Sequence, residues 1–248
     1  MMNIAQYLDS TYLKTPAQSG LSQEETLQKD IELTQEAIDH GIFAVMIRPD
    51  YVSEIKKYIQ EKNSDVVVGT VIGFHEGTYS VEEKLAEAEK AVADGADELD
   101  FVINYGAYLK GDLELVKEEF LQCTKLCLEH HKIAKWIIEI AALNDGQIAD
   151  LTKNISGWAE ENFSENDLSK IFVKSSTGFY ETEGGKPNGA TFEGIKIMLE
   201  NAGKLSVKAA GGVRTPEDAE KMISLGVKRI GTSSALALIK NQSASEGY

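Results

Sequence analysis

Eight short apolar runs, rich in β-branched residues, recur along this chain, and each is followed by a polar stretch with helical periodicity. Continuous apolar runs of this length are typical of strands that are buried on both faces, as in parallel sheets covered by helices. The repeat therefore predicts eight parallel strands that alternate with helices. The expected strands are segment 7–10 and the runs that begin at Phe43, Val66, Glu98, Lys135, Ile171, Ser206 and Arg229.

The stretches between these runs carry start and stop signals of helices. Ser22 with Glu25, and Ser80 with Glu83, have the spacing of a capping box, and Thr215 precedes a proline that suits the first helical position. Glycines lie where a left-handed residue would end a helix before the next strand. These glycines are Gly41, Gly95, Gly203 and Gly226.

Chain length selects among the folds that such a repeat allows. The chain has 248 residues and no linker rich in Pro, Gly or Ser, and a closed barrel of eight βα units needs about 250 residues. We therefore expect a single α/β domain, a (β/α)8 TIM barrel over residues 1–248, with a flexible tail from about residue 241. An open, doubly wound sheet is the alternative.

Charge and hydropathy restrict the partners. With 40 acidic and 25 basic residues the formal net charge is -15, which argues against nucleic-acid binding and requires any anion site to be local. No apolar stretch reaches the roughly 18 residues of a membrane span, so no membrane partner is expected. The N-terminus lacks the features of a secretory signal, which predicts a cytoplasmic protein.

Cysteine and histidine spacing gives no indication of a metal site. Cys123 and Cys127 lie four residues apart in one expected helix, where packing is the simplest interpretation, and the four histidines show no HxH or HExxH spacing. We expect no bound metal.

Two lysines interrupt apolar strands near their carboxyl ends, where barrel enzymes place reacting groups. Lys174 follows Ile171–Val173, and Lys208 follows Val207 on the next strand. Adjacent strands lie about 4.8 Å apart, so these side chains should be neighbours. Their repulsion and desolvation favour a neutral amine, which can attack a carbonyl near neutral pH. The alternative is that each lysine reaches solvent or pairs with a carboxylate.

Several acids also lie among apolar residues. Asp100 is placed inside an expected strand, where an acid needs a partner such as Lys174 or Lys208. Asp9 and Glu139 are embedded in the same way, and Lys135 opens the expected fifth strand. For Glu139 and Lys135, a structural ion pair and a catalytic or orienting role both remain open.

Glycine and serine follow the last two expected strands, where barrels commonly bind phosphate. Their exposed backbone N–H groups, together with one from the loop after the sixth strand, would form an anion cradle, with tight turns as the alternative. Segment 179–189 on this face is either a mobile lid or an ordinary loop. The cradle residues are Gly178, Gly211, Gly212, Ser233 and Ser234, with Arg214 as an additional cation.

Seven motifs, spread over nearly the whole chain and in the same order, resemble the deoxyribose-phosphate aldolase family. They are DSTYLK from Asp9, VIGF from Val71, GADELDFVIN from Gly95, FVKSSTGF from Phe172, GATFEG from Gly189, KAAGGVRT from Lys208 and GTSS from Gly231.

The resemblance implies a class I aldolase that reversibly cleaves 2-deoxy-D-ribose 5-phosphate to acetaldehyde and D-glyceraldehyde 3-phosphate, with no cofactor. It assigns the Schiff-base nucleophile to Lys174, the second lysine that lowers its pKa to Lys208, and the acid of the proton relay to Asp100. The cradle residues match the family's phosphate-contacting positions. Asp9 and Thr11 of the first motif are candidate supporting residues. Relatives are commonly dimers, so a homodimer that acts on small sugar phosphates and aldehydes is expected.

Some positions depart from the family pattern. Met46 stands where many members have cysteine, which predicts tolerance to acetaldehyde, and Phe179 stands where some have lysine. His75 replaces a usual proline, and Ile140 replaces a common threonine. Some members end in a tyrosine that reaches the active site, so Tyr248 has either that role or none. An aldolase for another sugar phosphate and a non-catalytic phosphate-binding barrel are the competing functions.

Overall fold

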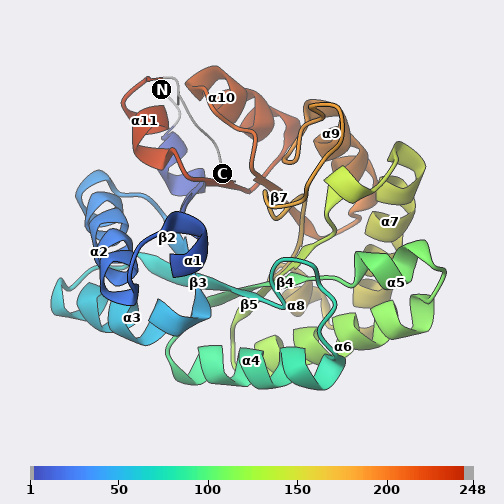
Figure 1. The fold of residues 1–248 in the computed structure, drawn as a ribbon. Coiled ribbons are helices and arrows are strands. Elements are labelled where there is room, and N and C mark those ends of the chain that lie inside the picture. The colour runs from blue at the N-terminus through green and yellow to red at the C-terminus, as the bar shows by residue number, and fades with distance from the viewer. Residues whose placement is uncertain (1–2, 243–248) are drawn as a thin grey trace.

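Eight parallel strands close into a barrel in the computed structural model, which describes residues 3–242. Each strand pairs with its neighbours in sequence, and β1 pairs with β8. Figure 1 shows the helices arranged around the strands. The closed order confirms the predicted TIM barrel and excludes the open sheet. The strands are β1 (Leu8–Thr11), β2 (Ala44–Ile47), β3 (Val67–Ile72), β4 (Glu98–Val102), β5 (Ile133–Ile137), β6 (Ile171–Lys174), β7 (Ser206–Ala210) and β8 (Arg229–Thr232).

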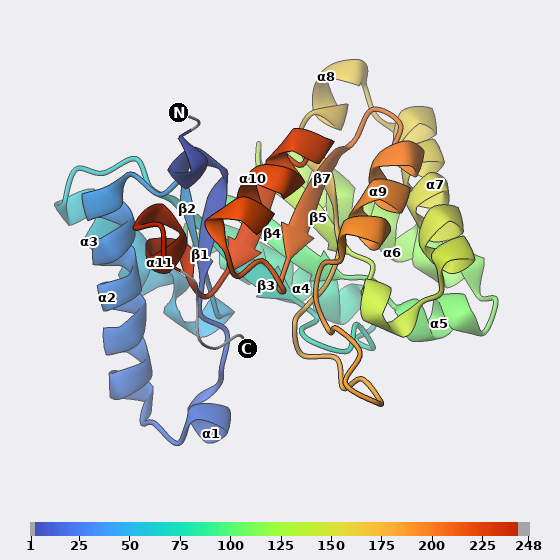
Figure 2. The same ribbon diagram turned by 90° about the horizontal axis from the view of Figure 1, so that it is seen from above.

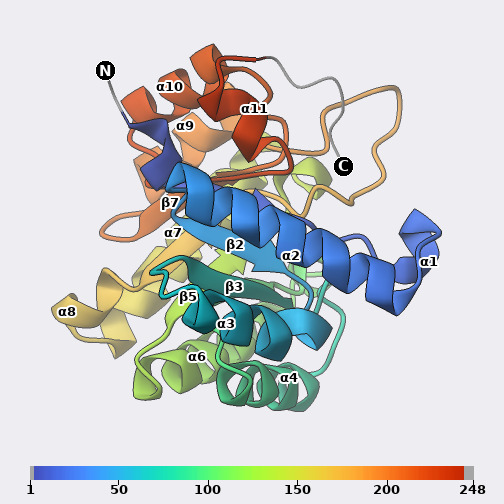
Figure 3. The same cartoon turned by 90° about the vertical axis from the view of Figure 1, so that its left-hand side faces the viewer.

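Helices surround the barrel and bury the outer faces of its strands; α2, for example, lies across the outside of β1 and β2 (Figure 3). The helices are α1 (Pro16–Ser19), α2 (Gln23–His40), α3 (Val52–Glu61), α4 (Val81–Ala93), α5 (Tyr105–Leu109), α6 (Leu113–Glu129), α7 (Asp145–Asn162), α8 (Glu165–Leu168), α9 (Phe192–Asn201), α10 (Pro216–Leu225) and α11 (Ala235–Ile239). Within residues 3–242, no helix is both long and apolar enough to cross a membrane.

The predicted helix ends are confirmed by the hydrogen bonds that form them. Ser22 and Ser80 each form a complete capping box at the start of α2 and α4, and Thr215 caps α10 ahead of its proline. Gly41 ends α2 in the left-handed conformation with φ 64°. These caps satisfy backbone groups that a helix end would leave unpaired.

Apolar side chains form two separate clusters. The larger cluster fills the shell between the strands and the helices. The smaller cluster lies inside the barrel and consists of Leu13, Met46, Val71, Phe74, Val102 and Ile137. Strands β2 and β3 therefore contribute apolar side chains to the barrel interior, and the charged side chains described below come from the other strands.

The carboxyl ends of the strands define the face where a site is expected. Figure 2 shows α1 and the segment between β6 and α9 projecting from the end to which the strand arrows point. That segment contains residues 179–189, as the sequence predicts for a loop on this face.

Two sequence predictions need correction in detail. Strand β5 begins at Ile133, so Lys135 lies in the middle of the strand rather than opening it. Glu139 lies beyond β5 and takes a left-handed conformation with φ 54°. Of the tail expected from residue 241, the structure describes only residues 241 and 242, and Tyr248 lies outside the described residues.

Candidate active site

Lys174 and Lys208 meet inside the barrel, as predicted from their places on adjacent strands. Their Cα atoms are register partners across β6 and β7. Both ammonium nitrogens donate to the same oxygen, Oδ2 of Asp100, at 2.8 Å each. The two lysines are thus joined by a carboxylate that lies between them.

Asp100 also binds a third lysine. Its Oδ1 accepts from Lys135 Nζ at 2.8 Å, and the register pairs Asp100 with Lys135 across β4 and β5. Burial alone would raise the pKa of this carboxyl, but Lys135, Lys174 and Lys208 together hold the pKa well below its usual value. Asp100 is therefore an ionised carboxylate in the resting site.

A deeper layer of charge lies beneath this group. Lys208 also contacts Asp9 Oδ2 at 2.6 Å, and Lys135 contacts Glu98 Oε2 at 2.5 Å. Arg229 donates to Oδ1 of Asp9 from Nε at 2.7 Å and to Oε1 of Glu98 from Nη1 at 2.9 Å. The guanidinium also packs 4.0 Å from the ring centroid of Phe43.

Glu98 and Arg229 are site residues that were not predicted from the sequence, although their spacing indicated that they share a face with other inward residues. Glu98 lies two residues before Asp100, and Arg229 lies two residues before Gly231 on β8. Residues two apart on a strand share a face. The alternation of faces along β4 and β8 therefore places Glu98 and Arg229 on the side that faces the barrel interior.

The amine of Lys174 is the weakened base of this group. Its pKa is lowered to about 8, chiefly by burial and further by Lys208 and Lys135, against the opposing effect of Asp100. The predicted repulsion from the second lysine is present, but desolvation is the larger cause. The pKa values of Arg229 and Lys135 are raised instead, because each of these cations contacts two carboxylates.

Glu139 fixes the segment that follows Lys174. Its Oε2 accepts from the backbone N–H of Thr177 at 3.0 Å and from the Thr177 hydroxyl at 2.5 Å. Thr177 Oγ1 in turn accepts from the N–H of Phe179 at 3.0 Å. The carboxyl of Glu139 is buried, which raises its pKa, and among residues 3–242 its Oε1 has no hydrogen-bond partner. Glu139 therefore orders this loop and forms no ion pair with Lys135, so the structural ion pair of the sequence analysis is wrong for this residue.

Thr11 lies at the carboxyl end of β1, and its hydroxyl donates to the carbonyl of Asp9 at 2.9 Å. This hydrogen bond stabilises the strand that carries Asp9 and does not involve the lysines.

The glycines of the expected anion cradle lie close together. Gly178, Gly211 and Gly212 all have positive φ, at 82°, 71° and 75°. A Cβ at Gly212 would lie 2.8 Å from the carbonyl oxygen of Ala190, and one at Gly211 would lie 3.1 Å from Cα of Gly189 and 3.8 Å from Cα of Gly178. Only glycine fits this junction of the loops after β6 and β7 without strain.

The amides of the cradle differ from the expectation at two positions. The N–H of Gly211 donates to the carbonyl of Gly231 at 3.1 Å, and the N–H of Ser234 donates to Thr232 Oγ1 at 3.1 Å. These two groups are engaged within the barrel, because the strand ladder and the turn before α11 use them first. Gly212, Ser233 and Arg214 lie exposed on this face.

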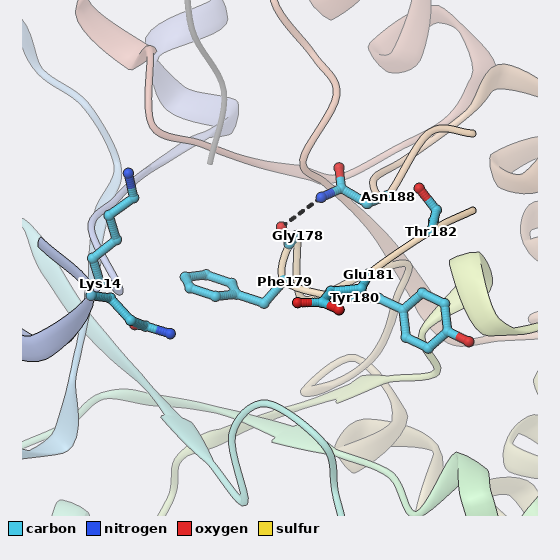
Figure 4. Close-up of a pocket in the computed structure, with 8 residues that line it drawn as sticks. Lys14, Gly178, Phe179, Tyr180, Glu181, Thr182 and Asn188 are labelled. Atoms are coloured by element: carbon cyan, nitrogen blue, oxygen red, sulfur yellow. Dashed lines mark hydrogen bonds between the residues drawn. The ribbon is translucent and has the colours of Figure 1, made fainter. Parts of the chain in front are cut away.

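An open cavity of about 540 Å³ adjoins the cradle (Figure 4). Asn188 donates from Nδ2 to the carbonyl of Gly178 at 2.9 Å and so ties the two ends of loop 179–189 together. Phe179 stacks on His75 with ring centroids 5.5 Å apart, and it meets Phe74 edge to face at 5.1 Å. The positions that depart from the family pattern, Phe179 and His75, thus form one aromatic group at the mouth. The cavity is lined by Lys14, Gln18, Gly178, Phe179, Tyr180, Glu181, Thr182 and Asn188.

The combined geometry defines a class of enzyme. An amine with a pKa near 8, next to a carboxylate and a second lysine at the carboxyl end of a barrel, can condense with an aldehyde and stabilise a carbanion through the iminium that forms. This is the chemistry of lysine-dependent barrel aldolases. Among residues 3–242, no group of three or more His, Cys, Asp or Glu side chains could hold a metal ion.

Comparison with known proteins gives the family. The sequence model of the DeoC/LacD family aldolases matches residues 4–241. The deoxyribose-phosphate aldolase of Thermococcus gammatolerans is 40% identical over 244 residues, which is 96% of each chain. The deoxyribose-phosphate aldolase of Deinococcus radiodurans is 36% identical over 249 residues, with both chains covered completely. The chain belongs to the DeoC/LacD aldolase family.

Solved structures agree with this assignment. The aldolase QR15 superposes with a TM-score of 0.79 at 30% identity and covers 97% of this chain and 96% of that chain. The deoxyribose phosphate aldolase of Aeropyrum pernix, described as a unique tetramer, superposes with a TM-score of 0.75 at 29% identity, over 96% of this chain and 89% of that chain.

Proposed function

We propose that this aldolase reversibly cleaves 2-deoxy-D-ribose 5-phosphate to acetaldehyde and D-glyceraldehyde 3-phosphate. The observation that carries the proposal is the amine of Lys174, whose pKa is about 8, held against Asp100 at the carboxyl end of the barrel. The relatives named above support the choice of substrate, and the glycine cradle beside the site suits its phosphate.

The reaction begins at the aldehyde carbon of the open-chain sugar. The neutral amine of Lys174 attacks this carbon, and loss of water from the carbinolamine gives a protonated imine. The bond between C2 and C3 then breaks, with its electron pair moving to the imine, while the C3 hydroxyl loses its proton and becomes the aldehyde of glyceraldehyde 3-phosphate. Protonation of the enamine at C2 and hydrolysis release acetaldehyde and restore the lysine.

The protons move through Asp100 and Lys208. Because Asp100 is ionised in the resting site, it is the base that takes the proton from the C3 hydroxyl, while the ammonium of Lys208 on the same oxygen is the donor for departing water. Asp100 then serves as the acid that protonates the enamine at C2, and hydrolysis of the imine returns a proton to Lys208. Lys135 remains hydrogen-bonded to the other oxygen and holds the carboxylate in place.

The phosphate would bind at the cradle formed by the loops after β6, β7 and β8. Gly178 and Gly212 allow close approach of the backbone, Ser233 and Ser234 lie ahead of α11, and Arg214 supplies charge in an otherwise acidic protein. Gly211 then contributes its shape rather than its N–H. Fixing the far end of the substrate holds the reacting bond over Lys174, so an unphosphorylated sugar should lose turnover as well as affinity.

We further propose that the enzyme acts in the cytoplasm as a homodimer. The Aeropyrum pernix relative is described as a tetramer, so light scattering coupled to size exclusion should decide between the two assemblies.

Borohydride trapping tests the function. Incubation with acetaldehyde and sodium borohydride, followed by peptide mass spectrometry, should add a two-carbon group at Lys174. Lys174→Leu should remove this adduct and abolish turnover of deoxyribose 5-phosphate, whereas Lys170→Leu, a control at the opposite end of β6, should retain both. An unmodified wild-type chain would favour the non-catalytic phosphate-binding barrel. Trapping combined with faster cleavage of fructose 1,6-bisphosphate would favour an aldolase for another sugar phosphate.

A further inference from the structure

Six charged side chains beneath the reacting lysine form a closed ring. Each cation of the ring contacts two of its carboxylates, and each carboxylate contacts two of its cations. In order around the ring they are Arg229, Asp9, Lys208, Asp100, Lys135 and Glu98. Every member is 5% exposed or less.

Charge is balanced within the ring but not in the full group. The ring holds three cations and three carboxylates, and Lys174 adds a fourth cation through Asp100 alone. With all seven side chains ionised, the group carries one excess positive charge in a buried place. Such a charge is strongly disfavoured in a low-dielectric interior. Loss of one proton removes the excess.

Position decides which cation loses that proton. Arg229, Lys208 and Lys135 each bridge two carboxylates, whereas Lys174 contacts a single carboxylate within residues 3–242. Lys174 is 4% exposed and Lys208 and Lys135 are 0% exposed, so Lys174 is also the lysine nearest to solvent. Among these three lysines, pairing with carboxylates is therefore weakest at Lys174.

We propose that Arg229 and Glu98, which lie a layer below the reacting atoms, are positioning residues that set the charge balance of the ring and thereby make Lys174 the lysine that gives up its proton most readily. This inference rests on the proposed Schiff-base function. It assigns a role in catalysis to two residues that touch neither the substrate nor Lys174. Removing either one changes the excess charge, and the two changes have opposite signs.

Other charged groups around Lys174 do not disturb this comparison. Glu139 faces it from the turn after β5, bound to Thr177, and β2 and β3 contribute the apolar Met46 and Val71 to the barrel interior. These groups are the same in every variant below. Only the ring changes.

The test is the pH dependence of kcat/KM for deoxyribose 5-phosphate. Activity should rise with pH through the titration of Lys174. Glu98→Gln leaves two excess charges and should move this rise to lower pH. Arg229→Gln leaves none and should move it to higher pH. For a separation on the order of 10 Å and an effective dielectric near 20, removal of one charge corresponds to a displacement of about one pH unit in each direction.

The double variant Glu98→Gln, Arg229→Gln restores a single excess charge and should return the profile to that of the wild type. It also provides a test if a single variant fails to fold, because it removes a cation and a carboxylate together. Glu119→Gln, which changes a buried ion pair with Lys84 outside the barrel, is the matched control and should leave the midpoint in place.

The same series is measured by borohydride trapping with acetaldehyde at each pH, with circular dichroism to verify folding. Opposite displacements that cancel in the double variant support the proposal. Displacements of the same sign, or lower activity with an unmoved midpoint in folded variants, overturn it and leave the proposed function intact. Absence of trapping at Lys174 in the wild type overturns the proposed function instead.

Discussion

Asp30 offers a quantitative test of how burial controls ionisation in this protein. It lies on α2 and is 1% exposed. Among residues 3–242, neither of its carboxyl oxygens has a hydrogen-bond partner. Desolvation raises the pKa of this carboxyl from 3.8 to about 8. The folded protein therefore holds Asp30 protonated at neutral pH, whereas the unfolded chain ionises it.

The sign of the effect on stability follows from linkage. Because the pKa in the folded state is the higher one, the folded state binds more protons between the two values, and stability falls as pH rises through that range. Between pH 5 and pH 8, the two pKa values of 3.8 and about 8 imply a loss on the order of 4 kcal/mol in the free energy of unfolding. The side chain of Asp30→Asn cannot ionise, so the free energy of unfolding of this variant should lack the part of the pH dependence that Asp30 causes.

The assay is urea unfolding of the wild type and Asp30→Asn at several pH values from 5 to 8, followed by circular dichroism. The free energy of unfolding of Asp30→Asn minus that of the wild type should grow by the amount given above as pH rises. Asp39→Asn, on the exposed side of α2, is the matched control and should run parallel to the wild type. If Asp30→Asn also runs parallel to the wild type, Asp30 is ionised and solvated in the folded protein, and the reasoning from burial is refuted.

Three further predictions concern the site. Lys208→Leu should lower kcat by about 10²- to 10⁴-fold, the usual contribution of a positioned proton donor, with trapping at Lys174 as the independent readout. Gly212→Ala places a side chain at φ 75° and 2.8 Å from the carbonyl oxygen of Ala190, so it should raise KM for the phosphorylated sugar far more than for unphosphorylated deoxyribose in parallel kinetics. The enzyme should keep its activity in concentrated acetaldehyde longer than thiol-bearing relatives do. The reason is that Met46 occupies the barrel interior and that burial raises the pKa of Cys123 to about 12. Met46→Cys should shorten the lifetime of activity, and equal lifetimes would contradict the explanation.

The strand pattern made most of the fold predictable. Apolar runs bounded by caps placed all eight strands, because a strand buried on both faces cannot tolerate polar residues without a reason. The same logic singled out Lys174, Lys208 and Asp100 as inward polar residues. Confirmation of their contacts depends on register, and the observed register pairs Lys174 with Lys208 directly.

Features that depend on three-dimensional competition for hydrogen bonds were not predictable in this way. The sequence cannot show that the N–H of Gly211 is taken by the carbonyl of Gly231, because that bond depends on where the β7–β8 ladder ends. Nor does it show that Glu139 leaves β5 in a left-handed conformation to reach Thr177. Both features are set by the junction between loops, where local propensity is weakest.

Glu98 and Arg229 were not predicted for a different reason. Sequence reasoning treated each buried charge as a question of one partner, whereas the structure distributes the pairing over a ring in which every member has two. If each charge is considered with one partner, the lowered pKa of Lys174 is attributed to the neighbouring cation, Lys208. In the structure, however, Lys208 and Lys174 share the oxygen of one carboxylate, which offsets much of their repulsion. Burial is the larger cause of the lowered Lys174 pKa, and the proposed charge balance of the ring would add to it at the lysine that is nearest to solvent, where a substrate can reach the amine.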